Sequence, residues 1–243
     1  MRILVAGGTT DAGRGICRRL VGAGWRVAIG GEAVKAEALA HSLGPNAMAT
    51  PGDAASPEQA AALVAAASAR LGGIDGLVVC QQGRAPGRIL DVTLDDWNAA
   101  VEASPRSLFM LVRAAHAQLK ETRGAIVAVG TAEALAPAPG NRITSALLAG
   151  SVHLARVLAL ELAADGIRVN TVSTGRLGEP GTADNEIPIG HRIAPEDVGG
   201  AVLFLLGPAA SYISGQNVVV DGGMVDGFCG PVAPVGRNGL PCA

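Results

Sequence analysis

The first sixteen residues constrain the fold more than any other part of the chain. An apolar run at Ile3–Ala6 leads straight into Gly7 and Gly8, and an amphipathic segment follows from Gly13. A buried strand, a glycine turn and a helix in this order are typical of the first unit of a parallel α/β sheet. Because such a turn gathers backbone amides at a helix N-terminus, it also suits a phosphate group.

Strand-like and helix-like runs alternate along the rest of the chain. The expected strands are Ile3–Ala6, Arg26–Ile29, Ala47–Thr50, Gly76–Val79, Ala125–Val129, Arg168–Val172 and Asn217–Val220. The expected helices lie near Gly13–Gly22, Ala33–Leu43, Pro57–Leu71, Leu94–Lys120, Thr144–Ala164 and Pro195–Leu206. This alternation predicts an α/β fold, a doubly wound, parallel, seven-stranded sheet with helices on both faces. We expect one domain over residues 1–224 and an extended tail over residues 225–243.

Composition agrees with a buried parallel sheet and argues against several classes of protein. Apolar residues make up 49% of the 243 residues and aromatic residues only 2%. The core must therefore be aliphatic, which suits strands buried on both faces. A net charge of −2 argues against nucleic acid as a partner and gives no polybasic reason to bind a membrane. The apolar runs are of strand length, short of the roughly 20 residues that span a bilayer.

The cysteines indicate a reducing compartment. Cys17, Cys80, Cys229 and Cys242 show no metal-ligand spacing, so we expect free thiols and no metal site. Met1 leads almost directly into the first strand, which leaves no room for a signal peptide. We therefore expect a cytoplasmic protein.

Four sequence segments carry a resemblance to a known family. They are AGGTTDAGRGI at the start, PGDAASPEQ after the third strand, GIRVN at Gly166–Asn170, and SYISGQNVVVDGGM at Ser211–Met224. From residue 1 to about residue 224 the chain resembles the short-chain dehydrogenase/reductase family. The resemblance implies a Rossmann-type fold and oxidoreductase chemistry with a nicotinamide cofactor.

The cofactor motifs of that family are altered here. The family's T-G-x-x-x-G-x-G turn keeps its outer glycines as Gly7 and Gly13, but its middle glycine is Asp11. A carboxylate beside a pyrophosphate is unfavourable, although Asp11 is also a good candidate to cap the first helix. Asp53 matches the family residue that contacts adenine, and of the family's N-N-A-G only Gly83 remains.

The ribose and nicotinamide sides are altered as well. The acid expected after the second strand is displaced by one residue, from Gly31 to Glu32, which favours NAD over NADP. The family's P-G after the sixth strand has become Thr174-Gly175. We therefore treat the pocket as degenerate and expect no cofactor in this chain, with NAD bound by an active partner subunit.

The reaction centre that the family uses is missing. A phenol with an ordinary pKa of about 10 transfers a proton near neutral pH only when a nearby cation lowers that pKa. The family places a Tyr and a Lys four residues apart on one helix face for this purpose, with a Ser and an Asn beside them. The four corresponding positions are Thr144, Leu148, Thr131 and Ser104. We expect none of them to be catalytic.

No other residues restore this chemistry in the sequence. The chain has one tyrosine, Tyr212, and its only lysines are Lys35 and Lys120. Glu133 lies two residues past Thr131, and His153 lies nine residues past Thr144 on the same helix. We interpret Glu133 as a solvated acid at a helix start and His153 as a packed or surface side chain, in preference to substitute catalysts.

Two long apolar helices predict an oligomer. The segments Leu94–Lys120 and Thr144–Ala164 carry more apolar surface than one sheet covers, and Pro105 is expected to kink the first. In the family, helices at these places pair with another subunit in a four-helix bundle. The tail after Val225 is apolar, and it either packs on a partner or is a disordered terminus.

The sequence is compatible with three candidate functions. The first is a catalytically silent subunit that pairs, as a heterotetramer, with a competent homologue that oxidises an alcohol with NAD, or forms a homo-oligomer if there is no such homologue. In the family, such pairs include complexes that oxidise a β-hydroxyacyl-CoA in aromatic degradation. The second is a ligand or redox sensor, and the third is a divergent but active NAD(P)-dependent oxidoreductase.

Overall fold

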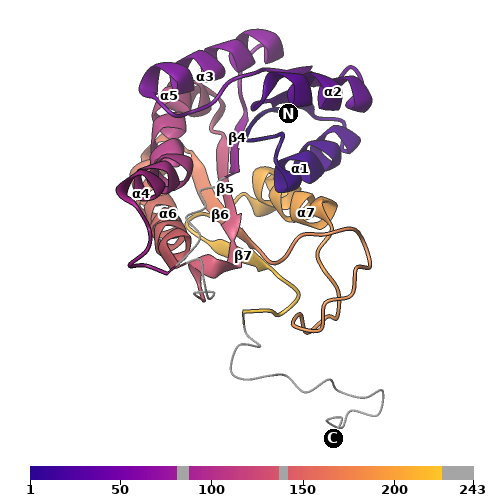
Figure 1. Cartoon of the computed structure of the whole chain (residues 1–243). Helices are drawn as coiled ribbons and strands as arrows, with labels where there is room; N and C mark the ends of the chain where they lie inside the picture. Colours follow the sequence, from indigo (N-terminus) through magenta and orange to yellow (C-terminus); the bar gives the residue numbers. More distant parts are fainter. Residues whose placement is uncertain (81–87, 137–141, 226–243) are drawn as a thin grey trace, which may run out of the picture.

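A seven-stranded parallel sheet forms the centre of the computed structural model, which describes residues 1–80, 88–136 and 142–225 (Figure 1). The strand order is β3-β2-β1-β4-β5-β6-β7. The strands are β1 (Arg2–Ala6), β2 (Arg26–Ile29), β3 (Ala47–Ala49), β4 (Gly76–Cys80), β5 (Ala125–Thr131), β6 (Arg168–Thr174) and β7 (Asn217–Val220). The predicted doubly wound α/β fold is confirmed, and every strand lies within two residues of its predicted bounds.

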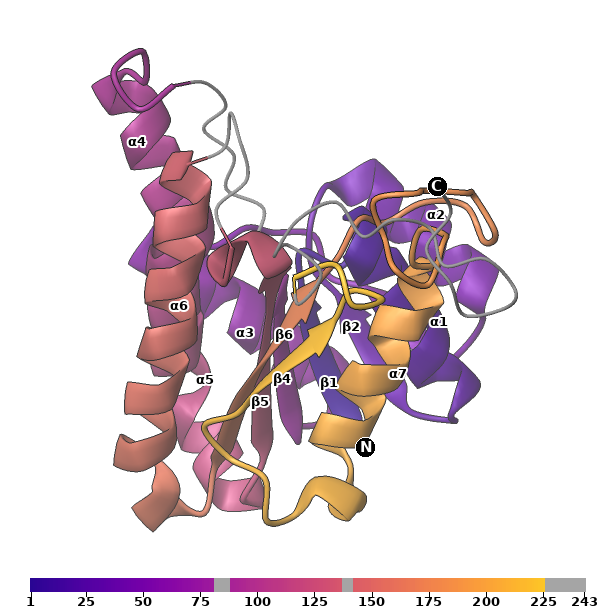
Figure 2. The same cartoon turned by 90° about the horizontal axis from the view of Figure 1, so that it is seen from below.

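Helices cover both faces of the sheet (Figures 1 and 2). On one face lie α3 (Pro57–Leu71), α5 (Ser107–Thr122) and α6 (Arg142–Glu161), and on the other lie α1 (Asp11–Gly22), α2 (Ala33–Leu43) and α7 (Pro195–Leu206). The helix α4 (Leu94–Val101) packs near the start of α6. Single 3-10 turns η2 (Ala132–Ala134), η3 (Ala163–Asp165) and η4 (Pro208–Ala210) follow β5, α6 and α7.

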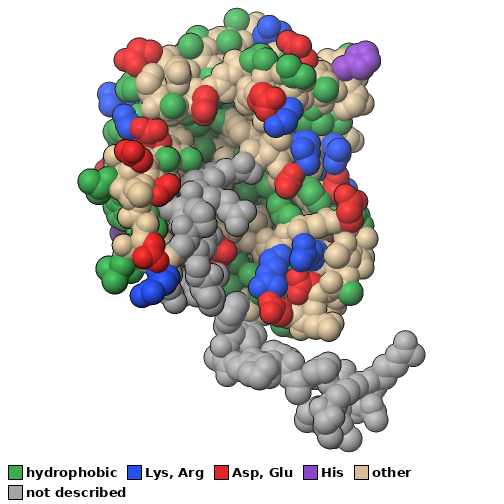
Figure 3. All heavy atoms as spheres, viewed as in Figure 1, with side chains coloured by type: hydrophobic (Ala, Val, Ile, Leu, Met, Phe, Trp, Pro, Cys, Tyr) green, Lys and Arg blue, Asp and Glu red, His purple; other side chains and the backbone are tan. Residues whose placement is uncertain are grey.

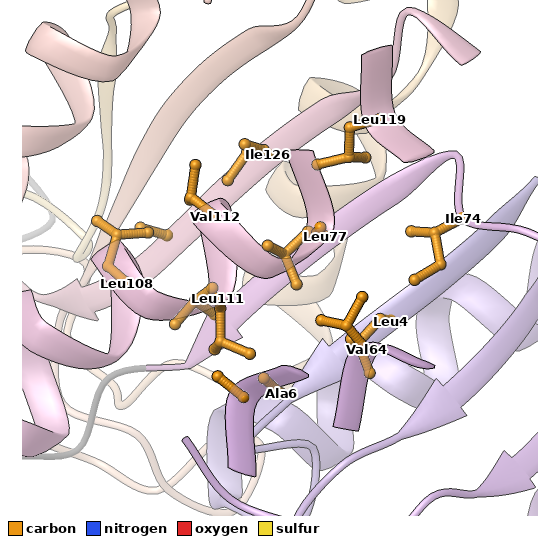
Figure 4. Close-up of a cluster of buried hydrophobic side chains, with 14 of the residues drawn as sticks. Leu4, Ala6, Val64, Ile74, Leu77, Leu108, Leu111, Val112, Leu119 and Ile126 are labelled. Atoms are coloured by element: carbon orange, nitrogen blue, oxygen red, sulfur yellow. The ribbon is translucent and has the colours of Figure 1, made fainter. Parts of the chain in front are cut away.

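Alternate residues of each strand supply the two halves of the core. Leu4 and Ala6 of β1 face α3 and α5, whereas Ile3 and Val5 face α1 and α7. Figure 4 shows the first half, in which aliphatic side chains from the sheet and the helices interdigitate. Each fully buried Leu or Ile contributes about 1.5–3 kcal/mol. Among the described residues, the fully buried core is almost entirely aliphatic, as the composition predicts, and Trp25 packs against its edge.

The segment predicted as one helix over Leu94–Lys120 is three pieces. Between α4 and α5 the backbone forms one π-helical turn, η1 (Glu102–Arg106), which contains Pro105. Proline has no N–H and its ring displaces the carbonyl one turn before it, so a wider turn accommodates it. The predicted interruption at Pro105 is confirmed, and it takes the form of a π turn.

Two of the segments that resemble the family, GIRVN and SYISGQ, are joined by hydrogen bonds in the C-terminal half. The amide of Asn170 on β6 donates to the Ile213 carbonyl at 2.8 Å and accepts from the Gln216 backbone at 3.0 Å. The guanidinium of Arg168 donates to carbonyls at the C-terminal end of α7, including Leu205 at 2.7 Å. These bonds explain why GIRVN and SYISGQ occur together in one chain.

One helix passes a length and composition test for a membrane span. Within the described residues, Ile143–Glu161 of α6 is long and apolar enough to cross a bilayer, with half of its window buried in the fold. The expectation that every apolar run is of strand length is therefore wrong for α6. Since its buried side packs on β5 and β6, α6 reads as a core helix.

Candidate functional site

A cavity of about 660 Å³ opens at the carboxyl ends of the strands, where the strand order reverses between β1 and β4. Crevices at such switch points are where doubly wound sheets bind ligands. Six segments supply the lining, which includes Gly7, Thr9, Thr10, Gly31, Glu32, Gly52, Asp53, Cys80, Ala99, Glu102, Ala103 and Ser107. The first half of the sheet and the α4–η1–α5 region therefore share one hollow.

The glycine turn keeps its compact form. Gly7 has φ of 73°, a conformation that favours glycine, and the Gly8 amide donates to the Gly30 carbonyl at 2.8 Å. A Cβ added at Gly13 would lie 2.3 Å from the Gly7 oxygen and 2.7 Å from the Gly8 Cα. Only a glycine at position 13 therefore allows α1 to start this close to the turn.

The first helix is capped by Thr10, so the expectation that Asp11 provides the cap is wrong. The Thr10 hydroxyl accepts from the Gly13 amide at 2.9 Å. Asp11 is the first residue of α1, its side chain is 69% exposed, and its carboxylate pairs with Arg14 at 2.6 Å. Threonine is also a good N-cap, and an acid at the next position is favourable to the helix dipole. Asp11 lies outside the lining of the cavity.

The place of the ribose-binding acid is taken by a hydroxyl. Gly31 has φ of 137°, and a Cβ there would lie 2.4 Å from the Thr9 Oγ1. The Thr9 side chain thus fills the space that an acid at position 31 would need. Glu32 lines the same cavity one residue later, but its carboxylate pairs with Lys35 at 2.6 Å.

The far wall of the cavity carries an acid and a thiol. Asp53 follows β3, and its carboxylate accepts from the Ala54 amide at 2.7 Å. Burial raises the pKa of Cys80, at the end of β4, to about 12, against an opposing hydrogen bond with the Thr10 hydroxyl. A thiol with such a pKa stays protonated and unreactive near neutral pH. Gln81, Gln82 and Gly83 lie outside the described residues.

The positions that correspond to the family's catalytic Ser, Tyr and Lys lie at the end of β5 and in the first half of α6. Thr131 ends β5, and its hydroxyl lies 3.3 Å from the Glu133 carboxylate. The Ser145 hydroxyl donates to the Glu133 carbonyl at 2.5 Å, which ties η2 to α6. The structure therefore holds Glu133 beside the old serine position in a half-buried place, rather than as the fully solvated acid that we expected.

The two helix positions that should carry the phenol and the ammonium are buried. Thr144 is 3% exposed and Leu148 is 3% exposed. Leu148 lines a space of about 10 Å³ together with Ala128 and Val172 of β5 and β6, and this space holds one water at most. Ser104 is fully buried within η1. No cation reaches this place from the lysines of the chain.

The only tyrosine and the two lysines lie elsewhere. Tyr212 is fully exposed in the loop before β7. Lys35 pairs with Glu32, and Lys120 pairs with Asp165 at 2.7 Å. His153 lies on an exposed position of α6, in agreement with the surface interpretation. In the described part of the chain, no three His, Cys, Asp or Glu side chains gather as a metal site.

Among the described residues, one end of this site keeps more of the family's dinucleotide-binding positions than the other. At the adenosine end, the glycine turn, Asp53 and the open cavity are all in place. At the nicotinamide end, an aliphatic side chain stands at position 148, so the second ribose has no ammonium partner. The predicted pocket positions Gly7 and Asp53 line the cavity, Gly13 supports the turn, Asp11 stands apart, and Gly83 lies outside the described residues.

Sequence reasoning missed several lining residues. Thr9 was overlooked because its role depends on its contact with Gly31, which is 22 residues away in the chain. Ala99, Glu102 and Ala103 were overlooked because they come from α4 and η1, which meet the glycine turn only in the tertiary fold.

Comparisons with known proteins agree with this geometry. Residues 10–225 match the family model described as Enoyl-(Acyl carrier protein) reductase. A 3-oxoacyl-[acyl-carrier-protein] reductase of Synechocystis sp. is 29% identical over 238 residues, covering 91% of this chain and 96% of that protein. An L-rhamnose 1-dehydrogenase (NAD(P)(+)) of Sphingomonas sp. is 31% identical over 242 residues, covering 91% and 95%.

Solved structures give the same result. A 3-ketoacyl-(acyl-carrier-protein) reductase from Brucella melitensis, complexed with NADH, superimposes with a TM-score of 0.86 at 28% identity, covering 92% of this chain and 97% of its own. A short chain oxidoreductase from Pseudomonas aeruginosa, bound to NADPH and containing an atypical catalytic center, gives 0.85 at 27% identity, covering 92% and 96%.

Proposed function

The chain belongs to the short-chain dehydrogenase/reductase family, and from that premise we propose that it is a catalytically silent member that supports an active, NAD-dependent homologue in a mixed oligomer. The observation that carries the proposal is Leu148, an aliphatic side chain buried where the family's pattern has a lysine. Its neighbour Thr144 is an aliphatic alcohol in place of the phenol. Neither side chain exchanges a proton with a substrate oxygen near neutral pH.

The loss of the phenol and the ammonium is large enough to abolish catalysis by this chain. A positioned general acid or base contributes about 10²–10⁴-fold in rate. An ammonium aimed at the developing charge adds an electrostatic contribution of its own. Because such groups act as a unit, their effects are not additive, but removing either one already takes most of the rate. When NAD binds to an active relative it supplies the hydride acceptor, and this chain lacks the residues that handle the proton.

Exposed apolar side chains on α5 and α6 support a partner subunit. Phe109 on α5 is 45% exposed, and Arg113 stacks over its ring with 5.4 Å between the guanidinium carbon and the ring centre. Leu160 on α6 is 81% exposed, and Val157 lies one turn before it. Large apolar side chains in such positions are typical of interfaces. Figure 3 shows acidic and basic side chains interspersed on one face of the molecule. A partner that binds this face would contact charges of both signs.

Our suggestion for the substrate of the proposed complex rests only on which of the family's catalytic and cofactor-binding residues this chain has lost. That pattern resembles the inactive subunit of 2-[hydroxy(phenyl)methyl]succinyl-CoA dehydrogenase, which acts in anaerobic toluene breakdown. A β-hydroxyacyl-CoA of aromatic degradation is therefore the first substrate class to assay with the active homologue. The partner, rather than this chain, would hold the catalytic NAD.

A divergent active oxidoreductase is the second candidate, and one contact favours it. The Thr131 hydroxyl lies within 3.3 Å of the Glu133 carboxylate, which is an arrangement that could hold a proton near a substrate. The Pseudomonas aeruginosa relative also has an atypical catalytic center. Turnover by this chain alone that is lost in Glu133→Gln would establish this candidate.

The experiment is co-expression with a short-chain dehydrogenase from the same genome that keeps the Tyr and Lys of the family's pattern. We expect the two to co-purify and the complex to oxidise its alcohol faster than the homologue alone. Leu160→Glu should weaken co-purification, because it places a charge on the exposed apolar face of α6. Val34→Glu is the matched control, since Val34 is 73% exposed on α2, on the opposite face of the sheet. Equal loss of binding in both variants would contradict the assigned interface.

A further inference from the structure

The segment from residue 176 to residue 193, which the structure describes throughout, lies between β6 and α7 and contains neither helix nor strand (the orange loop below α7 in Figure 1). Its two halves are nevertheless paired through the backbone. The Ile193 amide donates to the Arg176 carbonyl at 3.0 Å, and the Arg192 amide donates to the Thr182 carbonyl at 2.8 Å. We call this segment the strap, because it is folded back on itself.

One carboxylate joins the two ends of the strap. Asp184 lies in its middle with a side chain that is 8% exposed, and it accepts from the Arg192 Nε at 3.3 Å and from the Arg176 guanidinium at 3.5 Å. It also accepts from the Glu186 amide at 3.2 Å, while the Glu186 carboxylate pairs with Arg176. Because this carboxylate is buried between two guanidiniums, removing its charge weakens the join between the two ends. We call Asp184, Arg176 and Arg192 the clasp.

The strap is seated on the chain that follows β7. The Ile189 amide donates to the Gly222 carbonyl at 3.2 Å, and Ile187 is 1% exposed. A Cβ added at Gly222 would lie 2.8 Å from the Ile187 Cγ2. A Cβ added at Gly223 would lie 3.3 Å from the Pro188 Cγ. A side chain at position 222 would therefore push the strap away from its seat.

Residues 221–225, which we call the root because they lead into the tail, are folded around one buried carboxylate. Asp221 is 6% exposed, and it accepts from the Gly223 amide at 2.9 Å and from the Val225 amide at 2.7 Å. A Cβ added at Gly175, the residue directly before the strap, would lie 2.8 Å from the Asp221 Cα. The strap therefore meets the root at its start as well as near its middle.

We propose that the strap and the root open and close as one cooperative unit, and that the clasp is the contact that keeps this unit closed. Opening would expose Ile187 and would free the root, which sets the direction in which the chain leaves the fold after Val225. Proteins open locally in contiguous units of this kind, with a free energy below that of global unfolding. The inference goes beyond the proposed function and does not depend on it, because neither Asp184 nor Gly222 belongs to the site around position 148.

The test is hydrogen–deuterium exchange of the purified full chain, read by mass spectrometry of peptides from the strap, the root and the central strands. We expect Asp184→Asn to raise exchange at least about tenfold in the strap and in the root alike, while β1 and β4 exchange as in the parent chain. Asp11→Asn is the matched control, since Asp11 is also paired with an arginine but lies on α1. It should leave the exchange of both segments unchanged.

A second variant tests the coupling from the side of the root. Gly222→Ala places a methyl group against Ile187, and we expect at least about tenfold faster exchange in the strap, because coupling between two sites is reciprocal. Gly24→Ala is the matched control. Gly24 has a φ of 81°, close to the 67° of Gly222, but nothing lies within 4 Å of an added Cβ. Circular dichroism checks that all four variants fold.

The outcomes separate this inference from the proposed function. The inference is wrong if the strap opens without the root, if Asp184→Asn or Gly222→Ala leaves exchange in the strap unchanged, or if β1 and β4 exchange faster to the same extent. Each of these results would leave a silent subunit intact, since exchange does not measure catalysis. Turnover of an alcohol by this chain alone would overturn the proposed function, whatever the exchange shows.

Discussion

The shape of the glycine turn depends on the absence of a Cβ at Gly13. There is no room for a Cβ, because backbone atoms of Gly7 and Gly8 stand within 2.7 Å of its position. Backbone cannot move aside as a flexible side chain can, so a larger residue must push α1 away from the turn. Sequence reasoning found this residue because the spacing of the family's motif marks it.

We predict that Gly13→Ala destabilises the chain by about 1–3 kcal/mol, the usual cost of overpacking a tight site. Gly22→Ala is the matched control, since it lies on the same helix with nothing within 4 Å of the added Cβ. That control should be unchanged or slightly more stable, because alanine favours a helix. Urea unfolding of both variants measures the difference, and equal stabilities would contradict the packing argument.

Two thiols with raised pKa values make stability depend on alkaline pH. Burial raises the pKa of Cys80 to about 12 and also raises that of Cys17, both from an ordinary value near 9. The unfolded chain therefore releases thiol protons first as the pH rises above 9. The stabilisation is complete below pH 9 and is lost progressively toward pH 12, by up to about 1.4 kcal/mol per pH unit for each thiol.

This predicts a shallower pH dependence for Cys80→Ala. Between pH 9 and pH 11, the free energy of unfolding of that variant should fall less steeply than that of the parent chain, since one titrating group is gone. Urea titrations at several pH values give both slopes. Parallel slopes would mean that Cys80 ionises as readily in the folded chain as in the unfolded one.

The identity of the residue that caps α1 could not be predicted from the sequence around Asp11. Its position in the motif suggested either a cap or a charge beside a phosphate, and in the structure Thr10 caps the helix while Asp11 pairs with Arg14. Threonine and aspartate are both good caps, so the sequence alone could not choose between adjacent residues. The choice depends on which of them keeps an extended backbone at the end of the turn.

At the scale of elements, hydrophobic periodicity was sufficient for the sheet and for most helices. Strands β2 and β7 and helices α2, α3 and α7 have the predicted bounds. Aliphatic runs bounded by glycine or proline leave little ambiguity in a parallel sheet. The exception is the segment from Leu94, where the apolar pattern continues through η1 and only Pro105 indicates a change of helix type.

The C-terminal end of α7 provides a test of element-level stability. Arg168 donates to several carbonyls there, which would otherwise lack partners, and its charge complements the helix dipole. Arg168→Met should therefore cost about 1.5–3 kcal/mol. Arg14→Met removes only an exposed pair with Asp11 and should change stability by about 0–1 kcal/mol. Chemical unfolding compares the two, and a similar small effect in both would contradict the capping role.

At the scale of the whole molecule, the family's fold is retained although its Tyr and Lys are absent from the corresponding positions. The sheet, its crossovers and the cavity at the switch point need only aliphatic packing and a few glycines, and the sequence retains both. The missing phenol and ammonium were predictable from the sequence, since absent residue types need no structure. The burial of Leu148 and the independent open cavity were not predictable, because they depend on how β5, β6 and α6 close together.

Restoring two residues should not restore catalysis. In Thr144→Tyr/Leu148→Lys, the new ammonium must enter a site that is 3% exposed, and burial without a partner disfavours its charged form. We expect no NAD-dependent turnover and a loss of stability of several kcal/mol, on the order of the usual penalty for a buried charge. Spectrophotometric assay and urea unfolding measure the two effects, and measurable turnover would show that the scaffold still orients a dinucleotide.

If our proposal is correct, this chain has no hydride-transfer activity of its own. The most direct measurement is the absorbance at the wavelength of reduced nicotinamide, recorded for the purified chain with NAD⁺ or NADP⁺ and a panel of alcohols that includes β-hydroxyacyl-CoA esters. We expect a rate equal to the buffer background for the parent chain and for Glu133→Gln alike. A rate above background that Glu133→Gln abolishes would contradict it and identify a divergent active enzyme.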